Sequence, residues 1–255
     1  MMRRLLLIAC ITMLIDHIAF VFEPQLSSVS PWLYVICRTI GRLAFPLFAF
    51  CITEGAVKTS SPGKYIGRVA LFALIAQIPY SLMLAVRIGP NNGTKIITLF
   101  GQSAALYRGL SVMVTLLLGL IACLSVKKNK PVYAALALAA AYLIDNSIGM
   151  DYGFLGVVFI LALYLSRASK AGLVLTMVLF AACFHSKALI DFGYSLVKGH
   201  VFITKGVLFF AAMAFAAVPV LLYNGRKGPS AKLAVYCFYP AHMLALWAVN
   251  LLINK

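Results

Sequence analysis

Nine long apolar segments, separated by short polar connections, dominate the amino-acid sequence. Most of them approach or exceed the roughly 20 residues that an α-helix needs to cross the hydrocarbon core of a bilayer. They cover residues 5–22, 32–57, 66–86, 105–126, 131–148, 152–166, 171–188, 201–223 and 232–252. We therefore expect an all-α, polytopic helical membrane protein with about nine transmembrane helices and short loops.

The composition supports this interpretation. Of the 255 residues, 63% are hydrophobic and only 11% are charged, whereas a soluble domain is about 45–50% apolar and carries a charged coat. These values exclude a soluble enzyme, a disordered protein and a secreted disulfide scaffold. Six cysteines lie inside apolar segments without any C-x-x-C spacing, so neither disulfides nor a metal are expected. We expect one integral-membrane domain over residues 1–255.

The basic residues that give the net charge of +16 are distributed in the way that is typical of membrane anchors. Lys and Arg punctuate the apolar segments in twos and threes, as is typical of loops that fix topology. A nucleic-acid-binding protein would gather its basic residues on one soluble face, so no nucleic acid is expected. The anionic partners that we expect are the headgroups of the lipid bilayer and a phosphate-bearing ligand.

The distribution of Lys and Arg between alternate loops predicts the orientation. With a cytoplasmic N-terminus, thirteen of these residues lie on the cytoplasmic side and seven on the other side. This bias favours a multi-pass protein of the cell membrane with its N-terminus in the cytoplasm and its C-terminus outside.

Polar residues within the apolar segments are the informative ones, because each is costly in lipid and usually faces a protein interior. Asp16 and His17 interrupt the first segment, and Arg38 and Arg42 lie four residues apart on one face of the second. The predicted topology places both sets in the outer half of the membrane, so they are expected to meet. Further polar residues in the apolar segments are Glu54, Gln77, Asp151, Tyr152 and His242.

Three prolines lie within the predicted spans. Pro46, Pro79 and Pro240 each leave the carbonyl four residues earlier without its helical partner, which for Pro46 is the carbonyl of Arg42. Broken helices are tolerated in membranes mainly where they line a site enclosed by protein. The polar residues and the prolines together predict a buried polar site.

A structural interpretation competes with a functional one at each of these positions. Asp16 can form a purely structural ion pair with Arg38 or Arg42, and His17 can be a core histidine rather than a catalytic or binding group. For His242 the two interpretations have nearly equal weight. His185 and His200 fall in or near an outer loop, where we expect solvated side chains.

Several short motifs resemble the TraX family, and they occur in order over nearly the whole chain. They are Ile15-Asp16-His17-Ile18, Arg38-Thr39-Ile40-Gly41-Arg42-Leu43-Ala44-Phe45-Pro46-Leu47-Phe48, Glu54-Gly55, Tyr65, Arg68, Gln77-Ile78-Pro79-Tyr80, Thr115-Leu116-Leu117-Leu118-Gly119, Asp151-Tyr152-Gly153, Tyr223-Asn224-Gly225 and Phe238-Tyr239-Pro240-Ala241-His242. The founder of this family is an inner-membrane enzyme that N-acetylates F-pilin. The resemblance further implies kinship with transmembrane acyltransferases, which draw acetyl-CoA from the cytoplasm and use an intramembrane histidine.

The polar residues suit the chemistry that this resemblance implies. Acetyl transfer to an amine needs a base for the amine proton and positive charge or donors near the developing oxyanion. We expect His17 as the base, Asp16 as its orienting or stabilising partner, and Arg38 and Arg42 at the oxyanion or at acceptor carboxyl groups. Other candidates for contact with substrate or oxyanion are Gln77, Asp151, Tyr152, Tyr239 and His242.

The donor is expected to be acetyl-CoA, and no metal is expected. Lys64 and Arg68, at the predicted cytoplasmic end of the third segment, are the candidates for the CoA phosphates. The acceptor is an amine of a protein or small molecule, with the N-terminus of a pilin-like or other small membrane or secreted protein or peptide as one candidate. The alternative function is a proton-coupled small-molecule transporter, which would also use intramembrane Asp, His and Arg and broken helices.

Overall fold

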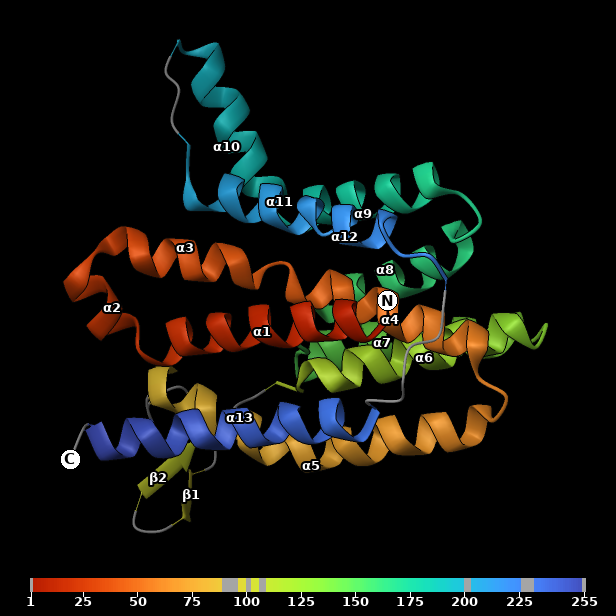
Figure 1. The fold of residues 1–255 in the computed structure, drawn as a ribbon, viewed down its shortest axis with the longest axis horizontal. Helices are drawn as coiled ribbons and strands as arrows, with labels where there is room; N and C mark the ends of the chain where they lie inside the picture. The colour runs from red at the N-terminus through yellow and green to blue at the C-terminus, as the bar shows by residue number, and fades with distance from the viewer. Residues whose placement is uncertain are drawn as a thin grey trace. The chain divides into compact units, whose positions relative to one another are not determined.

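The computed structural model describes residues 2–88, 96–99, 102–105, 109–199, 203–225 and 232–253. Within these residues the chain forms thirteen helices and one two-stranded hairpin (Figure 1). Each of the nine apolar segments contains helix, so the expected helical fold is confirmed apart from the hairpin. By its contacts the chain divides into two compact units. Three helices contribute residues to both, namely α4 (Ala44–Lys58), α8 (Gly153–Ser166) and α1 (Met2–Val21), of which only the last two residues belong to the second unit.

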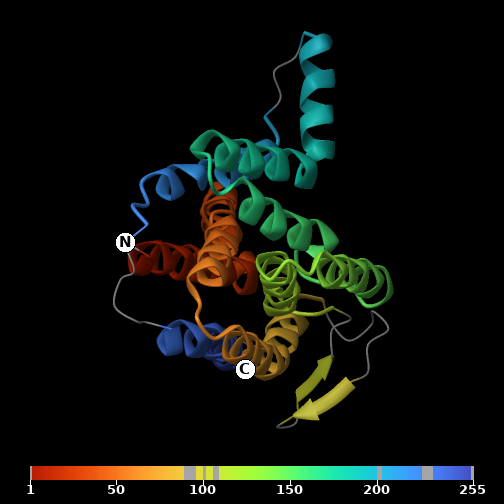
Figure 2. The same cartoon turned by 90° about the vertical axis from the view of Figure 1, so that its right-hand side faces the viewer.

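The first unit comprises Met1–Ala19, Glu23–Cys51 and Ala162–Ser230. Besides parts of α4 and α8, it contains α1 (Met2–Val21), α2 (Glu23–Val29), α3 (Pro31–Gly41), α9 (Lys170–Phe184), α10 (Ser186–Val197), α11 (Lys205–Phe215) and α12 (Ala217–Leu221). Helix α11 packs against α3, α9 and α10. Helix α10 projects away from α9 and α11 in both views (Figures 1 and 2).

The second unit comprises Phe20–Phe22, Ile52–Leu161 and Ala231–Lys255. It contains α5 (Pro62–Ile88), β1 (Ile96–Leu99), β2 (Gln102–Ala105), α6 (Val112–Lys127), α7 (Pro131–Ser147) and α13 (Lys232–Ile253), with parts of α4 and α8. Helix α5 packs against both α13 and α6, and α6 packs against α7. This unit therefore brings the end of the chain against its third apolar segment.

The helices differ in whether they can cross a membrane. Four stretches of the described chain are long and apolar enough, namely Met2–Val21, Pro31–Lys58, Pro62–Val86 and Ala234–Ile253. A fifth candidate is the bent pair α9–α10, whereas Val112–Lys127, Gly153–Ser166 and Lys205–Leu221 are shorter apolar helices. By length and composition the structure thus supports four or five spans of the expected nine.

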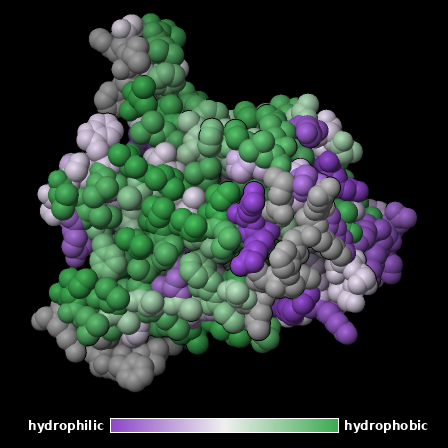
Figure 3. All heavy atoms as spheres, viewed as in Figure 1, coloured by the Kyte–Doolittle hydropathy of each residue, from purple (hydrophilic) through white to green (hydrophobic). Residues whose placement is uncertain are grey.

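The outer surfaces of the helices are apolar, as contact with lipid requires. Leu7 and Ile11 on α1 and Leu74 and Ile78 on α5 are each between 49% and 75% exposed. In Figure 3 the face over α1 and α3 is mostly hydrophobic (green). Such exposed apolar area is unusual on a soluble monomer, and together with the candidate spans it supports the expected helical membrane protein.

The second apolar segment is broken where the sequence predicted a break. Helix α3 ends at Gly41, and α4 begins at Ala44, two residues before Pro46. Between them the chain makes tighter turns, in which Arg42 N donates to Thr39 O at 3.1 Å and Leu43 N donates to Ile40 O at 3.2 Å. In contrast, α5 and α13 continue through Pro79 and Pro240.

Two sequence-based boundaries were wrong. The segment expected at 171–188 is not one straight helix, because α9 and α10 meet at 80° on either side of His185. The helix expected to begin at 105 begins at Val112, because Ser111 is extended and Leu110 instead pairs with Met150 in a short bridge. The hairpin before it pairs Ile96 with Ala105 in an antiparallel register.

The orientation relative to the membrane stays a prediction. Five of the basic residues on which it depends, Lys95, Arg108, Arg226, Lys227 and Lys255, lie outside the described residues, as does His200.

In the second unit, small side chains allow α4, α6 and α8 to approach one another around Ile160. The Oγ1 atom of Thr53 on α4 lies 3.5 Å from the carbonyl oxygen of Ile160, and Sγ of Cys123 on α6 lies 3.7 Å from the same oxygen. A Cβ atom added at Gly119 would lie 2.6 Å from Cδ1 of Ile160. Close packing at small residues is a main source of helix association in membranes.

Gly119→Ala should therefore destabilise the protein. Alanine favours a helix by about 1 kcal/mol over glycine, but overpacking against Ile160 should cost about 1–3 kcal/mol. Gly67→Ala on α5 is the matched control, because a Cβ atom at Gly67 meets nothing within 4 Å. Thermal unfolding in detergent should show a lower Tm for Gly119→Ala than for Gly67→Ala. Equal Tm values would contradict the tight packing.

Candidate functional site

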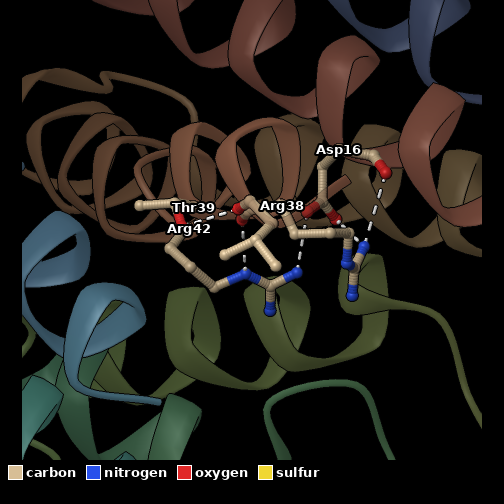
Figure 4. A network of polar contacts seen from close by, with 5 residues as sticks. Asp16, Arg38, Thr39 and Arg42 are labelled. Carbon is tan, nitrogen blue, oxygen red and sulfur yellow. Dashed lines mark hydrogen bonds and ion pairs between the residues drawn. The ribbon is translucent and has the colours of Figure 1, made fainter. Parts of the chain in front are cut away.

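The carboxylate of Asp16 on α1 accepts ion pairs from two arginines on the next apolar segment. Arg38 Nη1 lies 2.7 Å from Asp16 Oδ2, and Arg42 Nη2 lies 2.8 Å from Asp16 Oδ1. Figure 4 shows both guanidinium groups turned toward the one carboxylate. The expected contact between the two sets of polar residues is confirmed, and the i, i+4 spacing of the arginines places both on the face toward α1.

The sequence around the arginines makes this approach possible. A Cβ atom added at Gly41 would overlap the side chain of Asp16, so only glycine leaves room for the carboxylate there. The broken helix also contributes, because Arg42 Nε donates to the carbonyl of Arg38 at 3.2 Å while Nη2 reaches Asp16. No role of its own was predicted for Gly41 from the sequence. Its position directly before Arg42 was the available signal that it lies close to the ion pairs.

Two guanidinium groups share the one carboxylate of Asp16. The exposed fraction of the three side chains is only 13–18%, so the two positive groups are held close together in a partly buried site. Donors fixed in this way are suited to an anionic group.

His17 lies on a neighbouring face of the same helix. Successive residues of an α-helix point about 100° apart, so His17 lies on the side of α1 that also carries Cys10, Met13 and Val21. These three residues are buried. Its own side chain is partly buried. The structure thus places an imidazole one residue from the paired carboxylate, inside the first span.

A second polar group gathers in the other unit, around the start of α6. The Gln77 side chain on α5 donates from Nε2 to the carbonyl of Gly109 at 2.9 Å and accepts from the backbone N–H of Ser111 at 3.0 Å. Both ends of the amide therefore hold the irregular backbone that precedes α6. Ser111, which is fully buried, is a further residue that sequence reasoning did not single out.

Asp151 and Tyr152 form the turn that leads into α8. The Asp151 backbone N–H donates to Leu110 O at 2.9 Å, and its carbonyl accepts from Thr115 Oγ1 at 2.5 Å. Tyr152 has a φ of 62°, in the left-handed region that non-glycine residues seldom adopt. The buried Tyr239 on α13 interacts electrostatically with Asp151 and Tyr152. These candidate residues therefore lie in one neighbourhood of the second unit.

His242 is buried on α13, with 6% of its surface exposed. Its Nδ1 donates to the carbonyl of Phe238 at 2.8 Å, and its ring stacks on Phe238 and meets Tyr239 edge-on. This arrangement holds the imidazole firmly within its own helix.

Basic residues gather near the loops that follow α4 and α6. Lys64 and Arg68, one turn apart at the start of α5, are exposed, and the guanidinium of Arg68 lies 6.0 Å from the centre of the Tyr65 ring. Lys127 instead donates to the carbonyls of Ala56, Val57 and Thr59 at 2.7–3.1 Å, which caps the end of α4. Lys64 and Arg68 are thus the pair available for phosphates.

His185 is not the solvated loop residue that the sequence predicted. It lies at the bend between α9 and α10, and its Nε2 atom is buried. The expectation was wrong because α9 ends at Phe184, four residues before the predicted end of the segment.

No group of three or more His, Cys, Asp or Glu suited to a metal occurs among the described residues.

Comparison with known proteins gives one family and one curated relative. Residues 2–250 match the model of the TraX protein family. The chain is also 29% identical, over 265 aligned positions, to a protein of Dichelobacter nodosus described as "Probable fimbrial assembly protein FimC, serogroup H1"; the match covers 98% of this chain and 96% of that protein. No solved structure matches.

The two ion pairs that share Asp16 predict an unequal response to substitution. Asp16→Asn removes both ion pairs, whereas Arg38→Gln or Arg42→Gln leaves one of them intact. Asp16→Asn should therefore lower the unfolding free energy by about 3 kcal/mol, and each arginine variant by less. Thermal unfolding in detergent tests this order, with the exposed Asp191→Asn on α10 as control. Arginine variants that are less stable than Asp16→Asn would contradict it.

Proposed function

Because the chain belongs to the TraX family, we propose that it is a membrane-embedded acetyltransferase that moves an acetyl group from acetyl-CoA to an acceptor amine. The observation that carries the proposal is the Asp16–Arg38–Arg42 cluster with His17 beside it on α1. This combination supplies an imidazole and two guanidinium groups within one partly buried site.

The reaction needs one proton transfer and one charge stabilisation. The amine nitrogen attacks the thioester carbonyl, a C–N bond forms, and the C–S bond breaks to release CoA. We assign His17 as the base that takes the amine proton, because an imidazole titrates near neutral pH. We assign the carboxylate of Asp16, the preceding residue on α1, to stabilise the imidazolium that this transfer forms.

Arg38 and Arg42 are assigned to the developing negative charge. A guanidinium fixed by an ion pair is already oriented, so it stabilises an oxyanion without further reorganisation. The presence of two guanidinium groups at one carboxylate supports this role. The same charge would also attract a carboxyl group of the acceptor.

We assign the CoA phosphates to Lys64 and Arg68. Both side chains are exposed, basic and separated by one turn, which suits a ligand with several phosphate groups. They lie toward the N-terminus of α5, where the helix dipole also favours anions. With the orientation predicted from the basic residues, this end of α5 faces cytoplasmic acetyl-CoA.

The acceptor that we propose is the amine of a pilin-like or other small membrane or secreted protein or peptide. A relative that aligns over almost all of this chain is described as a probable fimbrial assembly protein, which supports an acceptor related to surface fibres. Further substrate contacts are proposed for Gln77, Asp151, Tyr152, Tyr239 and His242, and proton transfer is assigned to His17 alone.

His17→Ala should abolish acetyl transfer. Removal of a general base typically lowers the rate by a factor of about 10²–10⁴, and His17→Gln should not restore it, because a glutamine cannot take the proton. The assay is release of CoA from acetyl-CoA by detergent-purified protein with an amine acceptor. Both variants should insert and fold, since His17 is only partly buried.

His242→Ala is the comparison for the preceding experiment, because it also removes an intramembrane imidazole. Near-normal turnover of His17→Ala together with an inactive His242→Ala would reverse the assignment. Activity in both variants would exclude acyl transfer through an intramembrane histidine.

Replacement of both Lys64 and Arg68 by Gln should raise the KM for acetyl-CoA and leave kcat less affected, because the two residues bind phosphates away from the reacting carbon. Steady-state kinetics over a range of acetyl-CoA concentrations measure this. Lys187→Gln on α10 with Lys198→Gln, directly after the end of α10, is the matched control and should leave the KM unchanged. Equal KM values for both double variants and the native protein would remove Lys64 and Arg68 from the site.

A further inference from the structure

Helix α10 runs in a different direction from the other long helices of the first unit. It is bent by 80° from α9, and both views show it running steeply across the direction of α1 and α3 (Figures 1 and 2). It has 12 residues, none of them buried. Because α1 and α3 belong to candidate spans, a helix that crosses their direction runs along the plane of the membrane and adds little to its crossing.

One side of α10 rests on α11. A Cβ atom added at Gly206 on α11 would lie 2.5 Å from Cβ of Ala188, so Ala188 faces α11 closely. Phe192 and Ser195 follow Ala188 at the spacing that places them on the same side, and all three are partly buried. The contact with α11 thus fixes which side of α10 is turned outward.

The outward residues of α10 are sorted by polarity into two stripes, since successive residues point about 100° apart. The apolar stripe lies opposite α11 and consists of Ile190, Gly193 and Val197. The charged stripe lies beside it and consists of Lys187 and Asp191 on α10 and Lys198 directly after it, all exposed. Ile190 and Val197 are 69% and 86% exposed. Helix α10 is therefore amphipathic on the surface that it does not share with α11.

Tyr194 lies at the border between the two stripes. Its side chain is exposed, and Nζ of Lys198 lies 4.6 Å from the centre of its ring. Tyrosine is enriched where a bilayer meets water, because its ring is apolar and its hydroxyl is polar. A lysine at the same level can lay its aliphatic stem on apolar surface while its ammonium group reaches the headgroups.

We propose that α10 is an interfacial helix, which lies in the plane of the bilayer surface with its apolar stripe at the acyl chains and its charged stripe at anionic phospholipid headgroups. The bent pair α9–α10 is then not one broken span, because α10 lies on the membrane rather than across it. This inference is independent of the proposed acetyl transfer.

Lipid suits this surface better than a protein partner does. Ile190 and Val197 are the two large side chains of the apolar stripe, whereas each partner of a stable protein interface buries about 800 Å². A bilayer needs no such area, because the candidate spans already hold the chain in it. The charged stripe has two ammonium groups and one carboxylate, so its net positive charge complements anionic headgroups.

The first measurement uses the native full-length protein in nanodiscs of phosphatidylcholine mixed with phosphatidylglycerol. One diazirine probe is dissolved in the lipid and a second in the water, and mass spectrometry locates the labelled side chains. The lipid-borne probe should label Ile190 and Val197, and the water-borne probe should label Lys187 and Asp191.

Three results of this measurement would overturn the proposal. Labelling of Ile190 and Val197 by the water-borne probe would show that the apolar stripe faces water. Protection of both residues from both probes would show that protein covers them. Labelling of Asp191 by the lipid-borne probe would place α10 within the hydrocarbon core, as part of a span.

Two charge reversals test the contact with headgroups. Lys187→Glu with Lys198→Glu should lower the labelling of Val197 by the lipid-borne probe at least about twofold, because anionic headgroups attract lysine and repel glutamate. The difference should shrink in nanodiscs of phosphatidylcholine alone. Leu74 on α5, which is 75% exposed, is the internal reference and should be labelled equally in every variant.

Asp191→Asn is the matched control, because it changes the same stripe and keeps both lysines. Its Val197 should be labelled at least as strongly as that of the native protein. Equal labelling of Val197 in the double glutamate variant and in the native protein, each relative to Leu74, would overturn the contact with headgroups and with it the proposal.

Discussion

The ion-paired carboxylate of Asp16 is the constraint on which the first unit depends. A carboxylate within an apolar helix is tolerated only with partners of opposite charge, and both partners come from the next apolar segment. The distances of 2.7 and 2.8 Å to Arg38 and Arg42 fix how α1 lies against α3. Gly41 and the break before Pro46 follow from the same requirement, because the backbone has to leave room for the carboxylate and turn Arg42 toward it.

The second unit also uses polar side chains, in this case as hydrogen-bond partners of its irregular backbone. Gln77 bonds the chain before α6, and Lys127 caps the last carbonyls of α4. Thr115 has the same role at the turn that contains Asp151, because its Oγ1 donates to the Asp151 carbonyl. Non-helical backbone at membrane depth needs such partners. Several polar residues in these apolar segments therefore have a structural task, whether or not they also contact a substrate.

Sequence reasoning found the helical segments and the pairing of Asp16 with Arg38 and Arg42, because hydrophobic length and the cost of buried charge are local properties. It also located the break near Pro46. It missed the bend at His185 and the late start of α6 at Val112, since both depend on contacts between segments rather than on apolar character. The hairpin of β1 and β2 was missed because it lies in an expected loop. The role of Gly41 becomes visible only once α1 is placed against α3.

The two histidines of the first unit are best understood through their different neighbours. His17 follows the paired Asp16 carboxylate on the same helix, at the position where the proposed reaction requires a base. His185 lies instead beside Phe209 and within the electrostatic influence of Arg42, where a second positive charge would be repelled. The same cluster therefore places a carboxylate next to one imidazole in the sequence and a guanidinium near the other in space.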